Sequence, residues 1–119
     1  MITAKGGMDK GFIMLGCYTE GGFEGKVSAG EYIGDKEISE NVKFRVDKNE
    51  PVTLTMSSTS KRYVYFNDTD SSFIKQLLEG KDSVVVQLTS YDYDTSKAVF
   101  SLNGAKAAIT KVLEACKTK

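Results

Sequence analysis

The sequence predicts an α+β domain: a mainly antiparallel sheet, or a partly open sandwich, of six to seven strands with two packed helices, one of them C-terminal. Three observations predict this class. Short segments that alternate apolar and polar residues recur between turns rich in glycine, asparagine and serine, as in antiparallel sheets. Two other segments repeat their apolar residues at helical spacing. The length of 119 residues suits a single domain, residues 1–119, with one hydrophobic core.

The first half of the chain predicts three strands. Residues 1–10 form a loose or edge segment, and residues 11–18 are apolar on both faces, which is typical of a central strand. Residues 20–25 are rich in glycine and predict a turn before a second strand over residues 26–33. Residues 42–47 alternate strictly between core-facing and solvent-facing side chains, which predicts a half-buried third strand.

The middle of the chain predicts two short strands and a helix. Residues 52–56 and 62–66 alternate as strands on either side of a serine-rich loop. Residues 73–79 then place their apolar side chains on one helical face. The cap-type residues 67–71 predict the start of this helix, and Gly80 predicts its end as a C′ residue.

The end of the chain predicts a hairpin followed by a helix. Residues 84–89 are rich in β-branched side chains and predict a strand. Residues 91–96 turn the chain into a last strand over residues 98–102. Residues 105–116 predict an amphipathic helix, because their apolar side chains fall on one stripe that needs a sheet to lie on.

Charge and composition exclude several classes of function. The 16 basic and 16 acidic side chains cancel, so the sequence predicts no contact with nucleic acid. No apolar run approaches the roughly 18 residues of a membrane-spanning helix, so we expect no integral membrane segment. The chain has no histidine, the commonest general base and zinc ligand. We therefore expect no catalytic residues, no metal and no cofactor.

Acidic residues offer two further chemical interpretations. Asp92 and Asp94 resemble the opening of a calcium loop, but Lys97 and Asn103 stand where that loop needs glycine and glutamate. An enzyme that used carboxylates alone, such as Asp68 or Asp92, would need two acids brought together in a cleft. The departures from the calcium pattern disfavour metal binding, and a helix cap accounts for the acidic residues near Asp68.

Aromatic and charged side chains on outer strand faces are the strongest indication of function in the residues themselves. Tyrosine and arginine are enriched where proteins contact each other, although cross-strand tyrosines also simply cover sheets. The candidate partner surface consists of Arg45, Asp47, Tyr63, Tyr65, Tyr91 and Tyr93. We expect a protein partner rather than catalysis, and the sequence leaves the oligomeric state open.

The two cysteines, Cys17 and Cys116, both lie on predicted core faces. A bond between them would close a loop of almost the whole domain, which the chain-entropy model values at about 4–5 kcal/mol of stability. The alternative is a pair of buried free thiols, as in many cytoplasmic proteins. The residues alone leave both possibilities open.

Five segments, in the same order along the chain, resemble one protein family. They are Met14-Leu15-Gly16-Cys17, Val42-Lys43-Phe44-Arg45-Val46-Asp47, Phe73-Ile74-Lys75-Gln76-Leu77-Leu78, Val99-Phe100-Ser101-Leu102-Asn103-Gly104 and Leu113-Glu114-Ala115-Cys116. Together they resemble the C-terminal portion of the VasI-type proteins. Those proteins are associated with type VI secretion clusters, and similar small proteins or lipoproteins occur in phages and prophages.

The resemblance implies an exported protein that matures in the periplasm, with Cys17 and Cys116 bridged and with no catalytic residues. We therefore expect a non-enzymatic accessory or binding protein of bacterial or phage origin that acts on the envelope side through protein–protein contacts. The alternative is a cytoplasmic, phage-encoded inhibitor or counter-defence protein that binds a host protein and keeps both thiols free.

Overall fold

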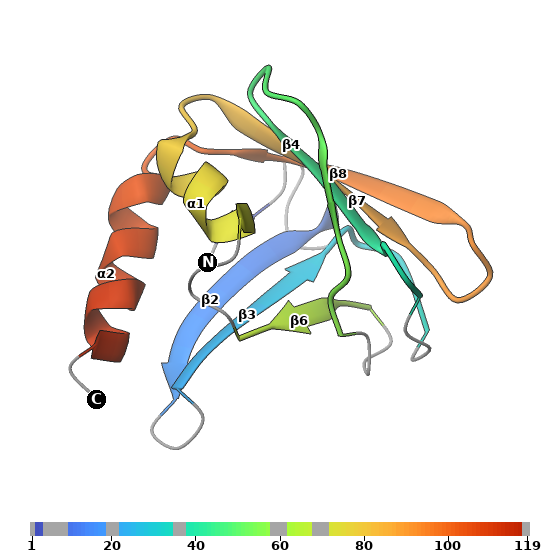
Figure 1. Cartoon of the computed structure of the whole chain (residues 1–119), viewed down its shortest axis with the longest axis horizontal. Coiled ribbons are helices and arrows are strands. Elements are labelled where there is room, and N and C mark those ends of the chain that lie inside the picture. The colour runs from blue at the N-terminus through green and yellow to red at the C-terminus, as the bar shows by residue number, and fades with distance from the viewer. Residues whose placement is uncertain are drawn as a thin grey trace.

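The structure is a computed structural model and describes residues 2–3, 10–18, 22–34, 38–57, 62–67 and 72–117. Over these residues the chain forms two four-stranded antiparallel sheets and two helices, the second of them C-terminal (Figure 1). The predicted α+β class is therefore confirmed. Apart from the two-residue β1 (Ile2–Thr3), the described residues form seven strands, and the two sheets enclose one hydrophobic core.

The first sheet is built mainly from the N-terminal third of the chain. Its order is β1, β2 (Phe12–Tyr18), β3 (Gly22–Ser28) and β6 (Val64–Phe66). β2 and β3 pair along their whole length. The predictions of a turn over residues 20–25 and of a strand over residues 26–33 are wrong in their bounds, because β3 begins at Gly22 and ends at Ser28.

Gly25 is a strand residue, and its surroundings explain why the sequence predicts a turn. It lies opposite Phe66 in the register of β3 and β6. A Cβ atom at Gly25 would lie 2.5 Å from the ring of Phe66, so the aromatic ring occupies the space above the glycine. Glycine here permits a close approach within a sheet, which one sequence does not distinguish from a turn.

The second sheet contains the hairpin predicted near the end of the chain, but its last strand begins at Thr95, inside the predicted turn over residues 91–96, and ends at Ser101. Its order is β5 (Val52–Leu54), β4 (Val42–Val46), β7 (Ser83–Thr89) and β8 (Thr95–Ser101). β1 lies near β8 without joining its sheet. Within the described residues, β8 therefore has one side paired with β7 and one side without a strand partner.

The helices α1 (Ser72–Glu79) and α2 (Ala105–Lys117) pack against each other and against the sheets (Figure 1). Phe73 of α1 is fully buried. Its ring centroid lies 4.9 Å from that of Phe44 in β4 and 5.7 Å from that of Phe66 in β6. One side chain of α1 thus contacts both sheets and holds them together.

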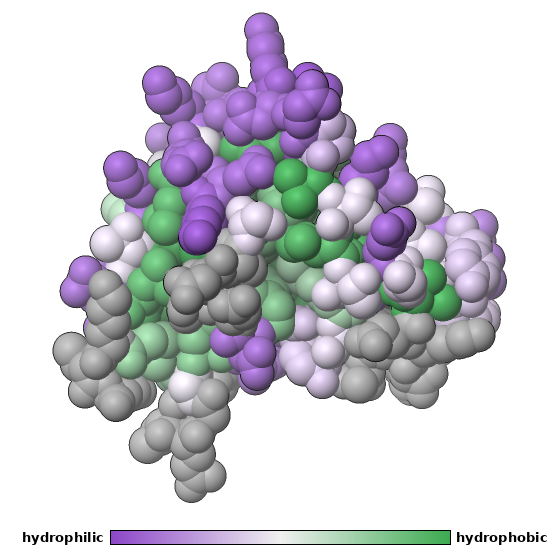
Figure 2. Space-filling view, in the orientation of Figure 1, coloured by the Kyte–Doolittle hydropathy of each residue, from purple (hydrophilic) through white to green (hydrophobic). Residues whose placement is uncertain are grey.

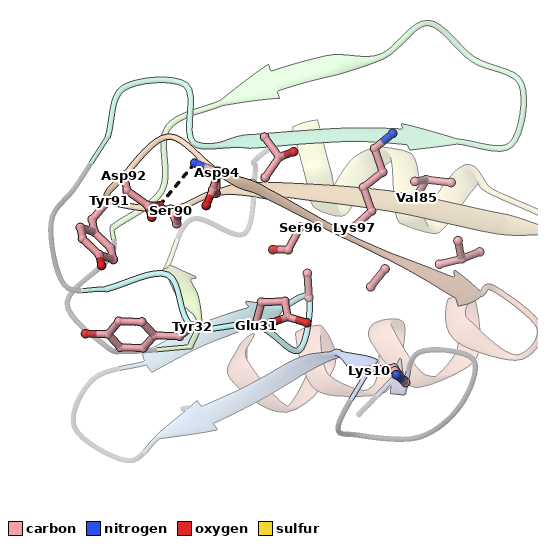
Figure 3. Close-up of a pocket in the computed structure, with 14 residues that line it drawn as sticks. Lys10, Glu31, Tyr32, Val85, Ser90, Tyr91, Asp92, Asp94, Ser96 and Lys97 are labelled. Carbon is pink, nitrogen blue, oxygen red and sulfur yellow. Dashed lines mark hydrogen bonds between the residues drawn. The ribbon is translucent and has the colours of Figure 1, made fainter.

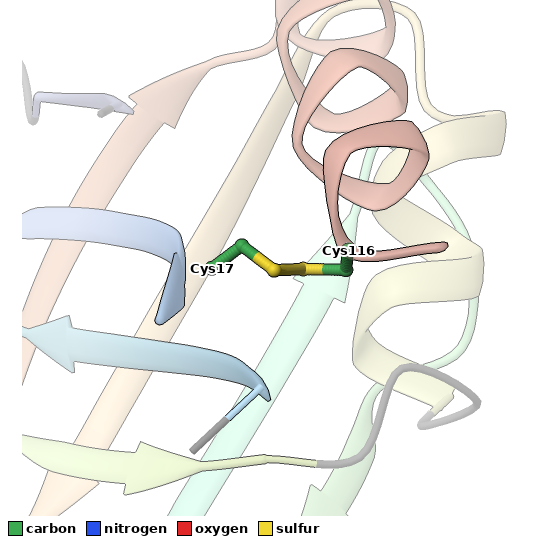
Figure 4. Close-up of a disulfide and its surroundings, with 2 residues drawn as sticks. All are labelled: Cys17 and Cys116. Atoms are coloured by element: carbon green, nitrogen blue, oxygen red, sulfur yellow. A yellow bond between two sulfur atoms is a disulfide. The ribbon is translucent and has the colours of Figure 1, made fainter. Parts of the chain in front are cut away.

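A disulfide joins Cys17 in β2 to Cys116 near the end of α2 (Figure 4). Their Cα atoms are 5.5 Å apart, and 99 positions separate the two residues in the sequence. Both side chains are partly buried. The bond that the family resemblance implies is present, and it fastens the C-terminal helix to the first sheet.

Gly80 follows α1 for a steric reason. α1 ends at Glu79 as predicted, but Gly80 does not adopt the left-handed backbone conformation of a C′ glycine. Its N–H still donates to the carbonyl oxygen of Gln76 at 2.9 Å, as within a helix. A Cβ atom at Gly80 would overlap the side chain of Leu102 and lie 2.6 Å from that of Val46.

We expect Gly80→Ala to lower the free energy of unfolding by about 1–3 kcal/mol, because the added methyl group overpacks the core. Urea denaturation followed by circular dichroism measures the loss. The neighbouring exposed variant Lys81→Ala serves as the control and should stay within about 0.5 kcal/mol of the wild type. Equal stability of both variants would show that the core yields at Gly80.

Candidate functional site

The surface offers two kinds of candidate site: apolar patches and a groove. On the face shown in Figure 2, hydrophilic residues gather toward the top of the view, and the visible hydrophobic residues form separate patches. Large continuous apolar patches are the ones that mark interaction surfaces. The groove is therefore the stronger candidate on the described residues.

A groove of about 970 Å³ runs along the side of β8 that has no strand partner (Figure 3). One wall comes from the β7–β8 hairpin and from residues 94–99. The facing wall comes from the segments just before β2 and just after β3: Lys10, Ala29, Glu31 and Tyr32. The groove thus lies where the edge of the second sheet faces the first sheet.

The backbone of β8 presents hydrogen-bonding groups to this groove. Two backbone hydrogen bonds mark the ends of the hairpin. The Ser90 N–H donates to the backbone carbonyl oxygen of Asp94 at 2.8 Å, and the Leu102 N–H donates to that of Asp82 at 2.9 Å. Bonded and unbonded pairs alternate along an antiparallel ladder, so the even-numbered residues of β8 bond to β7. The backbone N–H and C=O groups of the odd-numbered residues point away from β7, toward the side of β8 that has no strand partner. The odd-numbered residues that line the groove are Thr95, Lys97 and Val99.

The side chains of β8 alternate between the two faces of its sheet. Lys97 and Val99 are exposed on the outer face, where Val99 lies beside Val85 of β7. Ser96 and Ala98 point inward. The Ser96 hydroxyl oxygen is buried and has no hydrogen-bond partner among the described residues. A ligand along β8 would therefore meet a cation and an apolar group on one face and an unsatisfied hydroxyl group on the other.

The charges of the groove are separated along its length. Figure 3 shows Asp92 and Asp94 at the hairpin end, while Lys97 and Lys10 lie further along. Asp92 accepts hydrogen bonds from the Ser90 hydroxyl and, at 3.4 Å, from the Asp94 N–H. The bond from Ser90 is the main reason that the pKa of Asp92 lies below its ordinary value. Two carboxylates therefore mark the hairpin end, Glu31 lies on the facing wall, and the two lysines lie further from the hairpin.

Two tyrosines stand at the acidic end of the groove. The rings of Tyr32 and Tyr91 meet edge to face with their centroids 6.0 Å apart, and 52% and 48% of these side chains stay exposed. The Tyr91 N–H donates to the Ile33 oxygen at 3.0 Å, which ties the hairpin to the loop after β3. Exposed tyrosines held by backbone contacts are typical of protein-binding surfaces.

The six residues of the predicted partner surface do not lie on one sheet. Tyr91 lines the groove, and Tyr93, which is 70% exposed, belongs to the same hairpin. Tyr63 and Tyr65 lie at β6 in the first sheet and are partly buried. The Tyr63 ring packs 6.5 Å from that of Phe12 and lies 5.2 Å from the Lys26 ammonium, so this tyrosine helps to cover the sheet.

Arg45 and Asp47 stabilise turns of the second sheet. The Arg45 Nε donates to the Asn49 oxygen at 3.1 Å. β4 ends at Val46, one residue before the predicted end, and Asp47 adopts a positive φ of 53°. Its carboxylate accepts hydrogen bonds from the N–H groups of residues 81–83 at 2.8–3.0 Å. Asp47 thus has a structural role within the fold.

These hydrogen bonds, with the one from Lys81 first, hold the pKa of Asp47 below the ordinary value of 3.8. A lowered pKa means that Asp47 stabilises the fold above about pH 4 and that this stability is lost as the pH falls through the lowered pKa. We expect Asp47→Asn to lower the melting temperature at pH 7 and to flatten its decline below about pH 5. Melting curves over this pH range measure both effects. Lys48→Gln, in the same turn, should keep the wild-type slope, and an unchanged slope for Asp47→Asn would contradict the anchoring role.

The described residues contain neither a cluster of metal ligands nor a membrane-spanning helix. No group of three or more histidine, cysteine, aspartate or glutamate side chains is placed to hold a metal ion there. No helix of that part is long and apolar enough to cross a membrane. Asp68, one of the two carboxylates considered for catalysis, lies outside the described residues.

Comparisons with known proteins find no match for this chain. No family model, no curated protein and no solved structure is similar to it at a significant level. The resemblance to the VasI-type proteins stays a prediction from the five sequence segments. The function is therefore inferred from the groove and the disulfide.

Sequence patterns alone do not single out Glu31, Tyr32, Lys97 and Val99 as site residues. Burial alternates over residues 95–100 in the structure, but the sequence does not show this alternation, because Ser96 faces inward and Val99 faces outward. The position of β8 at the edge of a sheet depends on pairing between distant strands, which a local pattern does not report.

Proposed function

We propose that this chain is a non-enzymatic binding domain that recognises a protein partner through the groove along β8. The observation that supports this function is the combination, in one groove, of outward backbone groups, separated charges and exposed tyrosines. These are the features by which proteins capture segments of other proteins. Of the partner residues that the sequence predicts, Tyr91 belongs to this site and Tyr93 lies next to it.

The chemistry of Asp92 favours recognition over acid catalysis. A carboxyl group that acts as a general acid needs a raised pKa, so that it can donate a proton near neutral pH. Asp92 has the opposite property, because its hydrogen bond from Ser90 favours the ionised form. A fixed carboxylate of this kind is suited to binding a cationic group of a partner.

The disulfide supports an oxidising compartment. Disulfides persist in secreted and periplasmic proteins and are rare in the reducing cytoplasm. Neither cysteine is free, whereas the cytoplasmic inhibitor needs two free thiols. We therefore propose that the domain acts on the envelope side, in the periplasm, as an accessory protein of the kind that the VasI-type resemblance implies.

Site-specific crosslinking of the protein made from its full native gene, in its own host, tests this function. A photo-crosslinking amino acid at Tyr91 should give one discrete adduct with an envelope protein. The same group at Thr53, which is exposed on β5, should give none. No adduct from Tyr91, or the same adduct from both sites, would contradict binding through the groove.

A thiol titration of the same material under denaturing conditions tests the compartment. Protein from an oxidising compartment should show no free thiols before reduction and two afterwards, one for each cysteine. Two free thiols before reduction would contradict the envelope-side location.

A further inference from the structure

Resting on the binding function proposed above, we propose that the partner supplies an extended segment that pairs antiparallel with β8 as a fifth strand of the second sheet. The sheet has four strands in the described residues, and β8 is an edge strand of this sheet. Strand addition at a sheet edge lets backbone hydrogen bonds supply affinity while alternate side chains supply specificity.

The length of the groove fixes the length of the bound segment. Residues 95–99 line it, and five residues of strand span roughly 16 Å. Thr95, Lys97 and Val99 each direct an N–H and a C=O group outward, as the register with β7 requires. In a bonded antiparallel pair, the two opposite residues exchange both hydrogen bonds. A segment of five or six residues would therefore use all three positions.

The charges of the groove fix the direction and chemistry of the segment. β8 runs away from the hairpin, so an antiparallel segment ends at Asp92 and Asp94. A basic residue at its C-terminal end would meet these carboxylates and the Tyr32–Tyr91 pair. An acidic residue two or three positions earlier would lie opposite Lys97 on the outer face.

The remaining side chains complete the pattern of the segment. An apolar residue at its N-terminal end would lie beside Val99, which is 37% exposed. A hydroxyl-bearing residue opposite Ser96 would give the buried, unpartnered Ser96 oxygen a hydrogen-bond partner. The groove thus fits an extended six-residue segment with an apolar first residue, an acidic third residue, a hydroxyl-bearing fourth residue and a basic sixth residue.

A second copy of this chain fits the edge less well. If two β8 strands paired in the register centred on Lys97, two lysines would lie directly opposite each other. The registers that place Lys97 opposite Thr95 or Val99 give it no anionic partner. A lysine in the middle of an edge strand is also a usual protection against self-pairing.

The labelled peptide Val-Thr-Glu-Thr-Val-Arg, acetylated and amidated at its ends, is the probe for this mode. Fluorescence anisotropy with the oxidised protein measures its affinity. N-methylation of the third and fifth residues removes N–H groups aimed at β8 and should weaken binding about tenfold or more. N-methylation of the second and fourth residues removes N–H groups aimed away from β8 and should change binding less than about threefold.

Three protein variants test the same edge. Val99→Pro removes an outward N–H group that β7 does not use, so the hairpin should still form and the probe should bind about tenfold more weakly. Val99→Thr keeps the N–H group and serves as the matched control. Lys97→Glu should prefer a probe with lysine at its third position over the original one. Circular dichroism verifies that each variant is folded.

The outcomes separate the mode of binding from the function itself. Equal binding of the two N-methylated probes, or no binding at about 1 mM of the parent probe, would overturn strand addition. A dimer in sedimentation equilibrium that Val99→Pro dissociates would overturn it in favour of a second copy. If the Tyr91 adduct forms while the probe fails, only strand addition is refuted. If neither is seen, the binding function fails as well.

Discussion

Replacing Cys116 with serine should lower the free energy of unfolding by about 4–5 kcal/mol, because the disulfide closes a loop of almost the whole domain. Cys17 and Cys116 are 99 positions apart, so their bond removes many conformations from the unfolded chain. Net stabilities of domains are roughly 5–15 kcal/mol, so the variant keeps only a fraction of its stability. Urea denaturation of the oxidised wild type and of the variant measures this difference.

Two controls separate the lost bond from the substitution itself. The reduced wild type should lose about as much stability as Cys116→Ser. Ala107→Ser introduces the same side chain at an exposed position of the same helix and should change stability by no more than about 0.5 kcal/mol. Equal stability of the oxidised and reduced wild type would contradict the role assigned to the disulfide.

Phe73→Ala should lower the free energy of unfolding by about 3–5 kcal/mol, the usual loss for a buried phenylalanine. The Phe73 ring is fully buried between Phe44 of one sheet and Phe66 of the other, so its removal leaves a cavity where α1 meets both sheets. Urea denaturation of the disulfide-bonded protein measures the loss. Phe73→Leu keeps part of the volume and should cost clearly less.

The matched control for this prediction is an exposed aromatic residue. Tyr93 is 70% exposed on the β7–β8 hairpin, so Tyr93→Ala should stay within about 0.5 kcal/mol of the wild type. If both alanine variants lost the same amount, Phe73 would not be the link between the two sheets.

Local patterns were sufficient to predict the class of the fold. The strict alternation that ends at Val46 and the apolar stripe over residues 105–116 predict β4 and α2 with small errors at their ends. These signals are local because a strand or helix repeats its exposed side within a few residues. The role of the glycines was not predictable for the same reason: Gly25 is required by Phe66, and Gly80 is required by Leu102, which are distant in the sequence.

Polar anchors were also beyond the reach of local patterns. Asn41 is buried, and its side-chain amide exchanges two hydrogen bonds with the backbone of Met56, at 2.8 and 2.9 Å. Asp47 binds the N–H groups of residues 81–83 in a similar way. Each anchor joins segments at least 15 residues apart, so nothing beside Asn41 or Asp47 in the sequence distinguishes it from a surface residue.

The candidate site was predictable only in part. Tyr91 follows from the tyrosine-rich turn, and the disulfide follows from the family resemblance. The groove itself depends on the order of strands in the second sheet, which leaves β8 at its edge, and on the approach of the first sheet to that edge. Both are consequences of pairing between distant segments, so Lys97 and Val99 had no distinguishing signal.

Amide hydrogen exchange along β8, followed residue by residue by NMR in the oxidised protein, tests most directly whether this edge is open. The N–H groups of Ala98 and Phe100 bond to β7 and should exchange slowly, whereas those of Lys97 and Val99 point outward and should exchange about 100-fold faster. The hexapeptide probe should then slow Lys97 and Val99 selectively. Equally slow exchange at all four positions without the probe would mean that the outer side of β8 is already covered, which would contradict the proposed binding site.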